Sequence, residues 1–273
     1  MKKTALPIRA WRIGRLLLHL VLGVLEIALL FKFRDAAGRA AAISRWARRL
    51  CRILAVEVVV NGSRPAFLPA NTVLVANHVS WLDIFVMNTV SVSRFVAKAE
   101  VRNWPIVGWL CVRTGTLFVT RERRHDTARV NRSIADALAE GSCIAVFPEG
   151  STTDGFSLAG FNASLLQPAV DAGAEIVPVA LRYYDRTRMR SKAAAYVGEM
   201  SLLDSLLQLL VEPRLEAELH FFEPIPASGL HRRDLARTAE ALIGEKIRSD
   251  LPNSSQSVAA AATEPGTVSH RPG

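Results

Sequence analysis

The sequence predicts an α/β protein: a mixed β-sheet flanked by helices and preceded by a membrane-associated helical motif. From Glu57 onward, short β-branched runs alternate with helical stretches, as expected of an α/β domain. Before that point, a long apolar run lies within a strongly basic segment. We therefore expect a membrane-associated segment at 1–54, one α/β domain at 55–251 and a disordered tail at 252–273.

The positive charge is confined to the N-terminal segment. Residues 1–52 hold twelve Lys/Arg and two acidic residues, a net +10, and the rest of the chain carries −1, which together give the +9 of the whole. This distribution argues against nucleic acid as a partner. Arginines beside apolar helices favour anionic lipid headgroups, so we expect the chain at the cell inner membrane, on its cytoplasmic face.

The apolar run covers Leu16 to Phe31 and is a little short for a transmembrane span. Arg15, His19 and Glu26 share one stripe of the expected helix. Such a helix can lie in one leaflet, or it can pair its polar stripe with a neighbouring helix. The alternative is a buried helical hairpin of a soluble protein. The next segment forms a basic amphipathic helix whose arginines share one face: Arg45, Arg48, Arg49 and Arg52.

The α/β domain contains seven expected strands. Helices are expected between them, most clearly at Asp126–Glu140, where Gly141 provides the stop, and at Arg233–Leu251. The strands are expected at Val58–Val60, Thr72–Ala76, Arg94–Ala97, Thr116–Val119, Cys143–Phe147, Ile176–Leu181 and Leu215–Phe222.

The three cysteines, Cys51, Cys111 and Cys143, lie far apart without a C-x-x-C spacing. Their odd number argues against a disulfide framework and their spacing against a metal site. We expect reduced, buried thiols, no bound metal and no resident cofactor.

The first candidate site follows the strand at 72–76, in the sequence Asn77-His78-Val79-Ser80-Trp81-Leu82-Asp83. Histidine can remove a proton from a hydroxyl near neutral pH, and a carboxylate on its second ring nitrogen fixes the tautomer. Residues five apart on a helix point about 140° apart. His78 and Asp83 can therefore meet only if His78 lies in the turn before a helix and Asp83 in its first turn.

The same residues have a purely structural interpretation. Ser80 is a suitable N-cap, Asp83 then takes the third helical position of a capping box, and His78 is an ordinary turn residue. On this motif alone the two interpretations are about equally favoured.

Three later motifs also follow or occupy expected strands. Gly115-Thr116-Leu117-Phe118-Val119-Thr120-Arg121 ends in a guanidinium suited to an anionic group. Phe147-Pro148-Glu149-Gly150-Ser151 forms a rigid turn that can aim Glu149 at substrate hydroxyls, or leave it facing water. The run 176–180 carries Pro178, which suggests a strand bent or interrupted beside a pocket.

In this order the four motifs resemble the glycerolipid acyltransferase family, which includes 1-acylglycerol-3-phosphate acyltransferase. The resemblance covers roughly residues 70–185. It implies acyl transfer from acyl carrier protein or coenzyme A to the free hydroxyl of a lysolipid, with His78 as general base and Asp83 as its orienting partner. It also implies substrate binding by Asn77, Gly115, Phe118, Arg121, Glu149, Gly150, Ser151 and Pro178.

Two departures from the family pattern concern the acceptor. Phosphatidate-forming members commonly continue F-P-E-G with Thr-Arg, whereas Ser151 and Thr152 stand here, and a basic residue further on is replaced by Asn162. The resemblance implies 1-acylglycerol-3-phosphate as acceptor. The lost charges make lyso-ornithine lipid, or another lysolipid without a phosphomonoester, the alternative.

Two interpretations from other classes remain. A serine hydrolase would need a nucleophile elbow, and the nearest approach, Gly155-Phe156-Ser157-Leu158-Ala159, lacks the final glycine. A non-catalytic membrane-binding protein would need the basic helices alone.

Overall fold

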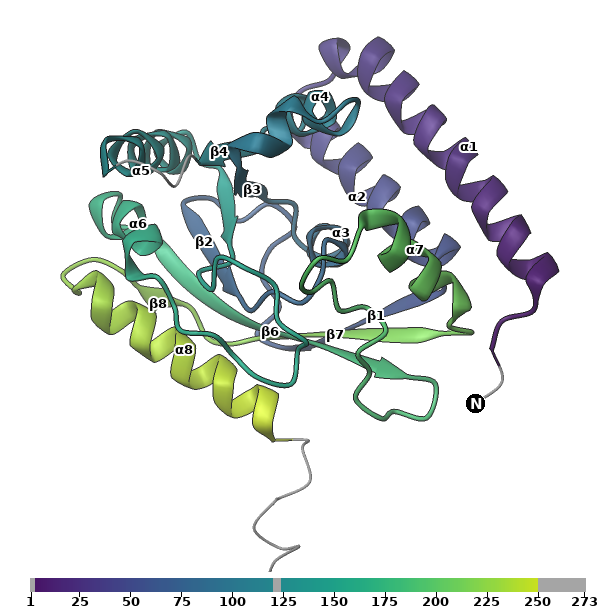
Figure 1. Ribbon diagram of the computed structural model, residues 1–273. Coiled ribbons are helices and arrows are strands. Elements are labelled where there is room, and N and C mark those ends of the chain that lie inside the picture. The colour runs from purple at the N-terminus through teal and green to yellow at the C-terminus, as the bar shows by residue number, and fades with distance from the viewer. Residues whose placement is uncertain (1–2, 120–123, 250–273) are drawn as a thin grey trace, which may run out of the picture.

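The structure is a computed structural model, which describes residues 3–119 and 124–249. Arg121 and the tail predicted at 252–273 lie outside these residues. One twisted sheet forms the centre, with helices on both of its faces and α1 (Leu6–Leu30) outermost (Figure 1).

The sheet has the strand order β1-β7-β6-β2-β5-β3-β4, and β8 pairs with β6. All pairs are parallel except β6 with β7 and β6 with β8, so the predicted mixed sheet is confirmed. The seven predicted strands all form, and β8, two residues long, was not predicted. The strands are β1 (Val56–Gly62), β2 (Thr72–Ala76), β3 (Arg94–Lys98), β4 (Leu117–Val119), β5 (Cys143–Val146), β6 (Glu175–Asp185), β7 (Leu215–Phe221) and β8 (Ile225–Pro226).

Two hydrophobic cores cover the two faces of the sheet. On one face α2 (Ala36–Ile53), α3 (Leu82–Asn88) and α7 (Leu202–Val211) pack through residues such as Leu50, Leu82 and Leu209. On the other face lie α5 (Arg124–Ala139), α6 (Gln167–Asp171) and α8 (Arg232–Arg248). Because β2 is covered on both faces, all five of its residues are buried.

The predicted helices form with small shifts. The helix expected from Asp126 is α5, which starts at Arg124 and is followed by Gly141 at φ +80°, a conformation that glycine adopts readily. The helix expected from Arg233 is α8. The remaining helical elements are α4 (Val107–Arg113) and the 3₁₀ turns η1 (Phe31–Phe33), η2 (Ala99–Asn103) and η3 (Ala163–Leu166).

The polar stripe of α1 pairs with α2, as one of the two predicted arrangements requires. The His19 ring stacks on Trp46 with a centroid distance of 4.5 Å, and His19 Nε2 lies 3.1 Å from the Trp46 carbonyl oxygen. Glu26 forms ion pairs with Arg34 and Arg45. The basic face of α2 is thus partly engaged within the protein, since Arg48 also donates to the Thr89 carbonyl at 2.9 Å.

The helix α1 is longer than the apolar run suggested. It begins at Leu6, with Pro7 in its first turn, and together with η1 it is long and apolar enough to cross a membrane. The prediction of a slightly short span was therefore wrong, because residues before the apolar run extend the helix. Its outer face is exposed and apolar, unlike that of a buried hairpin: Leu6, Trp11, Leu17, Leu18, Val21, Leu22, Leu25 and Leu29.

Candidate active site

The candidate site lies where β2 and β5 end. These strands run parallel and adjacent, so their carboxyl ends meet at one edge of the sheet. The chain leaves β2 at Asn77 and His78, and it leaves β5 at the turn containing Glu149. The sequence motifs separated by some 70 residues are thereby brought into contact.

His78 and Asp83 form a direct hydrogen bond. Nδ1 of His78 lies 2.8 Å from Oδ2 of Asp83. A carboxylate only accepts hydrogen bonds, so Nδ1 carries the proton and Nε2 is left with its lone pair. The Asp83 side chain is fully buried, whereas 20% of the His78 side chain is exposed. The geometric requirement deduced from the spacing is met, because His78 precedes α3 and Asp83 lies in its first turn.

The capping interpretation is only partly right. The helix begins at Leu82 with Trp81 as N-cap residue, one position later than predicted, but Oγ of Ser80 accepts from Leu82 N at 3.3 Å, as a capping serine does. Oδ2 of Asp83 accepts from the backbone N–H of both Val79 and Ser80, at 2.7 and 2.9 Å. Asp83 therefore fixes the turn and contacts the histidine with the same oxygen.

Glu149 holds two loops together rather than pointing at solvent or into open space. Its Oε1 accepts from His78 N at 2.7 Å and its Oε2 accepts from Ala159 N at 2.8 Å. Neither backbone contact was predicted from the sequence, and a contact of Glu149 with substrate hydroxyls stays a prediction. Burial raises the pKa of Glu149, and the two backbone donors act in the opposite direction.

Glu149→Gln is expected to lower the free energy of unfolding by roughly 1–3 kcal/mol, because the amide NH₂ would face a backbone donor. The raised pKa adds a pH dependence: the Glu149 contribution is lost as pH rises through it. The stability difference between wild type and variant should therefore shrink with rising pH. Thermal unfolding at several pH values measures both effects. The exposed Glu199→Gln is the control, with a change within about 0.5 kcal/mol.

The loop after Glu149 also holds His78 from its other side. Thr153 N donates to the His78 carbonyl at 2.8 Å. The His78 ring stacks on Phe147, with a centroid distance of 4.0 Å and an interplanar angle of 9°. Gly150 makes the turn at φ +74°, and Ser151 is exposed beside it. Residues 147–153 thus fix both the backbone and the ring of the histidine.

Asn77 is fully buried and extends the pairing of β2 with β6. Its side-chain Nδ2 donates to the Leu181 carbonyl at 2.9 Å, and its Oδ1 accepts from Leu181 N at 2.7 Å. An amide side chain can imitate a backbone peptide in this way. Asn77 therefore has a structural contact in place of the substrate contact that the family resemblance implies.

Gly115 lies just before β4 and Phe118 within it, and β4 is the edge strand, two strands away from β5. Gly115 precedes β4, and its carbonyl accepts from Arg94 Nε at 2.8 Å. Phe118 lies under the guanidinium of Arg102 at 5.8 Å. In the described part of the chain, no hydrogen bond or ring contact joins Gly115 or Phe118 to His78, and Arg121 lies outside that part.

Pro178 lies within a continuous strand, so the expected interruption does not occur. It pairs with Val75 across β2 and β6. Its carbonyl accepts from Phe222 N at 3.0 Å, on the side where β6 changes partner from β8 to β7. The N–H that proline lacks would point to that same side, so no hydrogen bond to β2 is lost.

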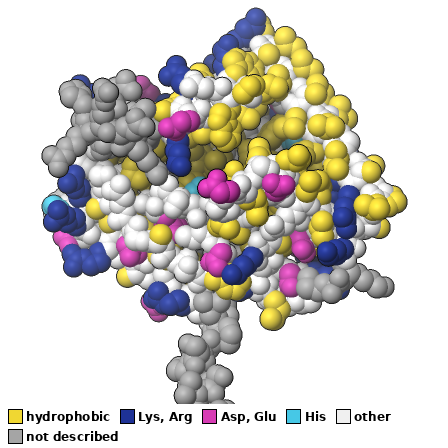
Figure 2. Space-filling model, viewed as in Figure 1, with side chains coloured by type: hydrophobic (Ala, Val, Ile, Leu, Met, Phe, Trp, Pro, Cys, Tyr) yellow, Lys and Arg dark blue, Asp and Glu magenta, His cyan; other side chains and the backbone are white. Residues whose placement is uncertain are grey.

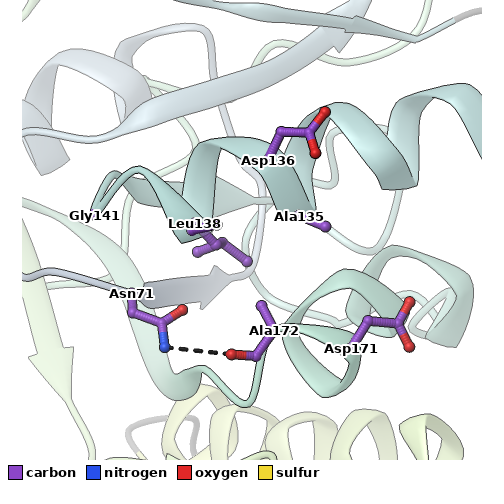
Figure 3. Close-up of a pocket in the computed structure, with 8 residues that line it drawn as sticks. Asn71, Ala135, Asp136, Leu138, Gly141, Asp171 and Ala172 are labelled. Carbon is purple, nitrogen blue, oxygen red and sulfur yellow. Dashed lines mark hydrogen bonds between the residues drawn. The ribbon is translucent and has the colours of Figure 1, made fainter.

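A hollow of about 420 Å³ lies at the opposite edge of the sheet from the candidate site (Figure 3). Asn71, Asp136 and Asp171 line it, and Asn71 directly precedes β2. Because β2 rises about 3.3 Å per residue, the hollow is roughly 20 Å from His78. On the face of the molecule in view, Figure 2 shows an apolar depression below α4.

Sequence reasoning missed one residue that contacts the pair. The hydroxyl of Tyr183 on β6 donates to Oδ1 of Asp83 at 2.8 Å. Its signal was the alternation of Val177, Val179, Leu181 and Tyr183, which places a single polar tip on the buried face of an otherwise apolar strand.

An α/β sheet whose strand end carries a partly exposed histidine held by a buried carboxylate is typical of enzymes that move a proton to or from a hydroxyl. The comparisons with known proteins identify the family. A family model described as acyltransferase matches residues 57–182. The lyso-ornithine lipid O-acyltransferase of Pseudomonas aeruginosa is 39% identical over 198 residues, 72% of this chain and 75% of that protein. This chain therefore belongs to the acyltransferase family and is an acyltransferase.

Two further relatives extend this comparison. The lyso-ornithine lipid O-acyltransferase of Rhizobium meliloti is 32% identical over 87% of this chain and 84% of that protein. The 1-acyl-sn-glycerol-3-phosphate acyltransferase of Neisseria gonorrhoeae is 39% identical over 62% of this chain and 66% of that protein. The crystal structure of 1-acyl-sn-glycerophosphate acyltransferase from Thermotoga maritima has the same fold, with a TM-score of 0.66 at 21% identity, over 91% of this chain and 98% of that one.

Proposed function

We propose that the protein transfers an acyl chain from a thioester, on acyl carrier protein or coenzyme A, to the free hydroxyl of a membrane lysolipid. The observation that carries this is the His78–Asp83 hydrogen bond at 2.8 Å in an acyltransferase. His78 Nε2 takes the hydroxyl proton while the oxygen attacks the thioester carbonyl. The C–O bond forms, the C–S bond breaks, and the thiolate leaves with the proton returned from His78.

This chemistry needs neither a covalent serine nor a metal, because a thioester is already activated. Asp83 keeps the proton on Nδ1 and stabilises the imidazolium that forms during attack. Glu149 and Thr153 hold the backbone of His78 in place. No resident cofactor is part of the proposal, and the acyl thioester is a co-substrate.

We favour lyso-ornithine lipid as the acceptor, with 1-acyl-sn-glycerol-3-phosphate as the second candidate. A phosphomonoester is bound best by cations, and residues 151–154 after the F-P-E-G turn contain none. Two cations of the described residues lie close to this turn: Lys192 is paired with Asp154 at 2.8 Å, and Arg190 donates to the Gly155 carbonyl. The relatives from Pseudomonas and Rhizobium carry the lyso-ornithine lipid name, and the Neisseria relative supports the second candidate.

An acceptor panel decides between them. Purified protein in detergent is given one thioester donor and either lyso-ornithine lipid, 1-acyl-sn-glycerol-3-phosphate or a lysophospholipid with a larger headgroup. We expect the highest kcat/KM with lyso-ornithine lipid. A higher kcat/KM with the phosphomonoester would overturn the acceptor assignment and leave the acyl transfer intact. Repeating the panel with acyl carrier protein and with coenzyme A identifies the donor.

We propose that the enzyme works at the cytoplasmic face of the inner membrane, with the outer face of α1 in the lipid. Figure 2 shows hydrophobic side chains gathered over α1. The neighbouring α4 segment adds exposed Trp104, Ile106 and Trp109, and α7 adds Leu203. Aromatic side chains are favoured at the membrane–water interface, so these elements extend the lipid-facing surface toward the depression below α4.

Leu18→Ser is expected to weaken binding to anionic vesicles by about 10-fold or more, because burying one leucine contributes roughly 1.5–3 kcal/mol. Leu18 is 59% exposed on α1. Leu230→Ser, at a 44% exposed leucine next to α8, is the matched control and should bind as wild type does. Cosedimentation with vesicles measures both. Equal weakening by the two substitutions would contradict the orientation.

A further inference from the structure

The buried hydroxyl of Tyr183 contacts the carboxylate of Asp83. Tyr183 is 2% exposed, and its hydroxyl donates to Oδ1 of Asp83 at 2.8 Å. The other carboxylate oxygen receives His78 Nδ1, Val79 N and Ser80 N. The two oxygens thus have separate tasks: Oδ2 contacts the histidine, and Oδ1 is held by the tyrosine.

The position of Tyr183 is set by the sheet and not by the loop that carries the histidine. Asn77 makes two hydrogen bonds to the backbone of Leu181, which fixes β6 against the end of β2. Tyr183 is two residues further along β6 and therefore lies on the same face as Leu181, directed at α3. The rigid strand can hold the carboxylate more firmly than the short turn at 78–81 can alone.

We propose that Tyr183 is a positioning residue for catalysis, which fixes the plane of the Asp83 carboxylate so that Oδ2 stays on His78 Nδ1. This inference rests on the proposed function. Without the hydroxyl, the carboxylate loses its donor on Oδ1 and can turn about its terminal torsion. The hydroxyl also directs the positive end of its dipole at the pair, so its loss makes the pair bind a proton more readily.

The titratable groups that face this cluster come from four elements of the described chain. His78 and Asp83 flank the turn before α3, Glu149 follows β5, Tyr183 lies on β6, and Cys51 on α2 adjoins Tyr183. Burial and the Asp83 charge raise the pKa of Tyr183 well above its ordinary value, and burial raises that of Cys51 to about 12. Both therefore stay protonated over the range in which activity is measured.

The test is Tyr183→Phe, which removes the hydroxyl and keeps the ring. We expect kcat to fall about 10- to 100-fold, the usual effect of one hydrogen bond to a charged group, with KM for the thioester and the lysolipid within about twofold of wild type. The acidic limb of the pH–rate profile should move to higher pH by about one unit. Tyr184→Phe, the same change on the opposite face of β6, is the control and should leave kcat and the profile as in wild type.

A double variant separates this inference from the proposed function. If Tyr183 acts through Asp83, adding Tyr183→Phe to Asp83→Asn should lower kcat by less than twofold further. Wild-type kcat and pH profile in Tyr183→Phe, with a lowered melting temperature, would overturn the positioning role, provided that His78→Ala and Asp83→Asn still lower kcat by about 10²- to 10⁴-fold. Wild-type turnover in those two variants would instead overturn the proposed function.

Discussion

Replacing His78 with alanine is expected to lower kcat by about 10²- to 10⁴-fold, the usual contribution of a positioned general base. The ring supplies the one basic atom, Nε2, that the Asp83 contact leaves available. Binding of the lysolipid should change little, because the ring is held by Phe147 and Asp83 and its removal leaves both loops braced by Glu149. Steady-state rates with fixed thioester and varied lysolipid separate kcat from KM.

His231→Ala is the matched control for this variant. His231 is exposed and serves as N-cap of α8, where its ring accepts from Arg233 N. Its loss should cost some stability and leave kcat unchanged. A wild-type kcat in His78→Ala would contradict the assignment of the base.

Asp83→Asn carries the second large expected effect, a fall in kcat of about 10²- to 10⁴-fold, because a neutral amide cannot balance the charge of the imidazolium that forms during attack. If the amide NH₂ of the variant takes the place of Oδ1, the amide oxygen takes the place of Oδ2 and still accepts from the backbone N–H groups of residues 79 and 80. The Tyr183 hydroxyl then loses its acceptor, at a cost of roughly 1–3 kcal/mol. The variant should therefore remain folded with a modestly lowered melting temperature.

Asp35→Ala is the control for Asp83→Asn, because it removes a helix N-cap away from the candidate site. Asp35 is the N-cap of α2 and accepts from Gly38 N at 2.8 Å. Removing it should lower stability by about 0.5–2 kcal/mol with kcat of the folded protein kept. If Asp83→Asn behaves in the same way, Asp83 is a capping residue and the catalytic interpretation fails.

The fold could be predicted from the sequence where burial imposes a clear period. β2, β5 and β6 are covered on both faces, so their runs are apolar throughout and recognisable. The start of α1 at Leu6 was not predicted from the sequence, because Arg9 and Arg12 interrupt the apolar pattern. Arg12 is nevertheless buried, since its guanidinium donates to the carbonyl of Glu212 at 2.9 Å. A contact to a residue 200 positions away leaves no local signal.

The candidate site could be predicted only where neighbouring residues determine its geometry. The contact of His78 with Asp83 followed from a spacing of five residues and helix geometry. The orientation of Glu149 did not, because both its partners are backbone amides, whose positions depend on how two loops fold. Pro178 was misread because sequence reveals that a donor is missing but not which side of the strand it would have faced.

Transfer of the acyl chain from a thioester to a lysolipid hydroxyl is tested by following both products in one reaction. Purified wild-type protein is mixed with labelled acyl thioester, with and without lysolipid, and free thiol, free fatty acid and acylated lipid are measured over time. We expect thiol release to require the lysolipid and to match the amount of ester formed. Release of free fatty acid at the same rate without lysolipid would identify a hydrolase, and absence of thiol release with every acceptor and donor would identify a non-catalytic protein.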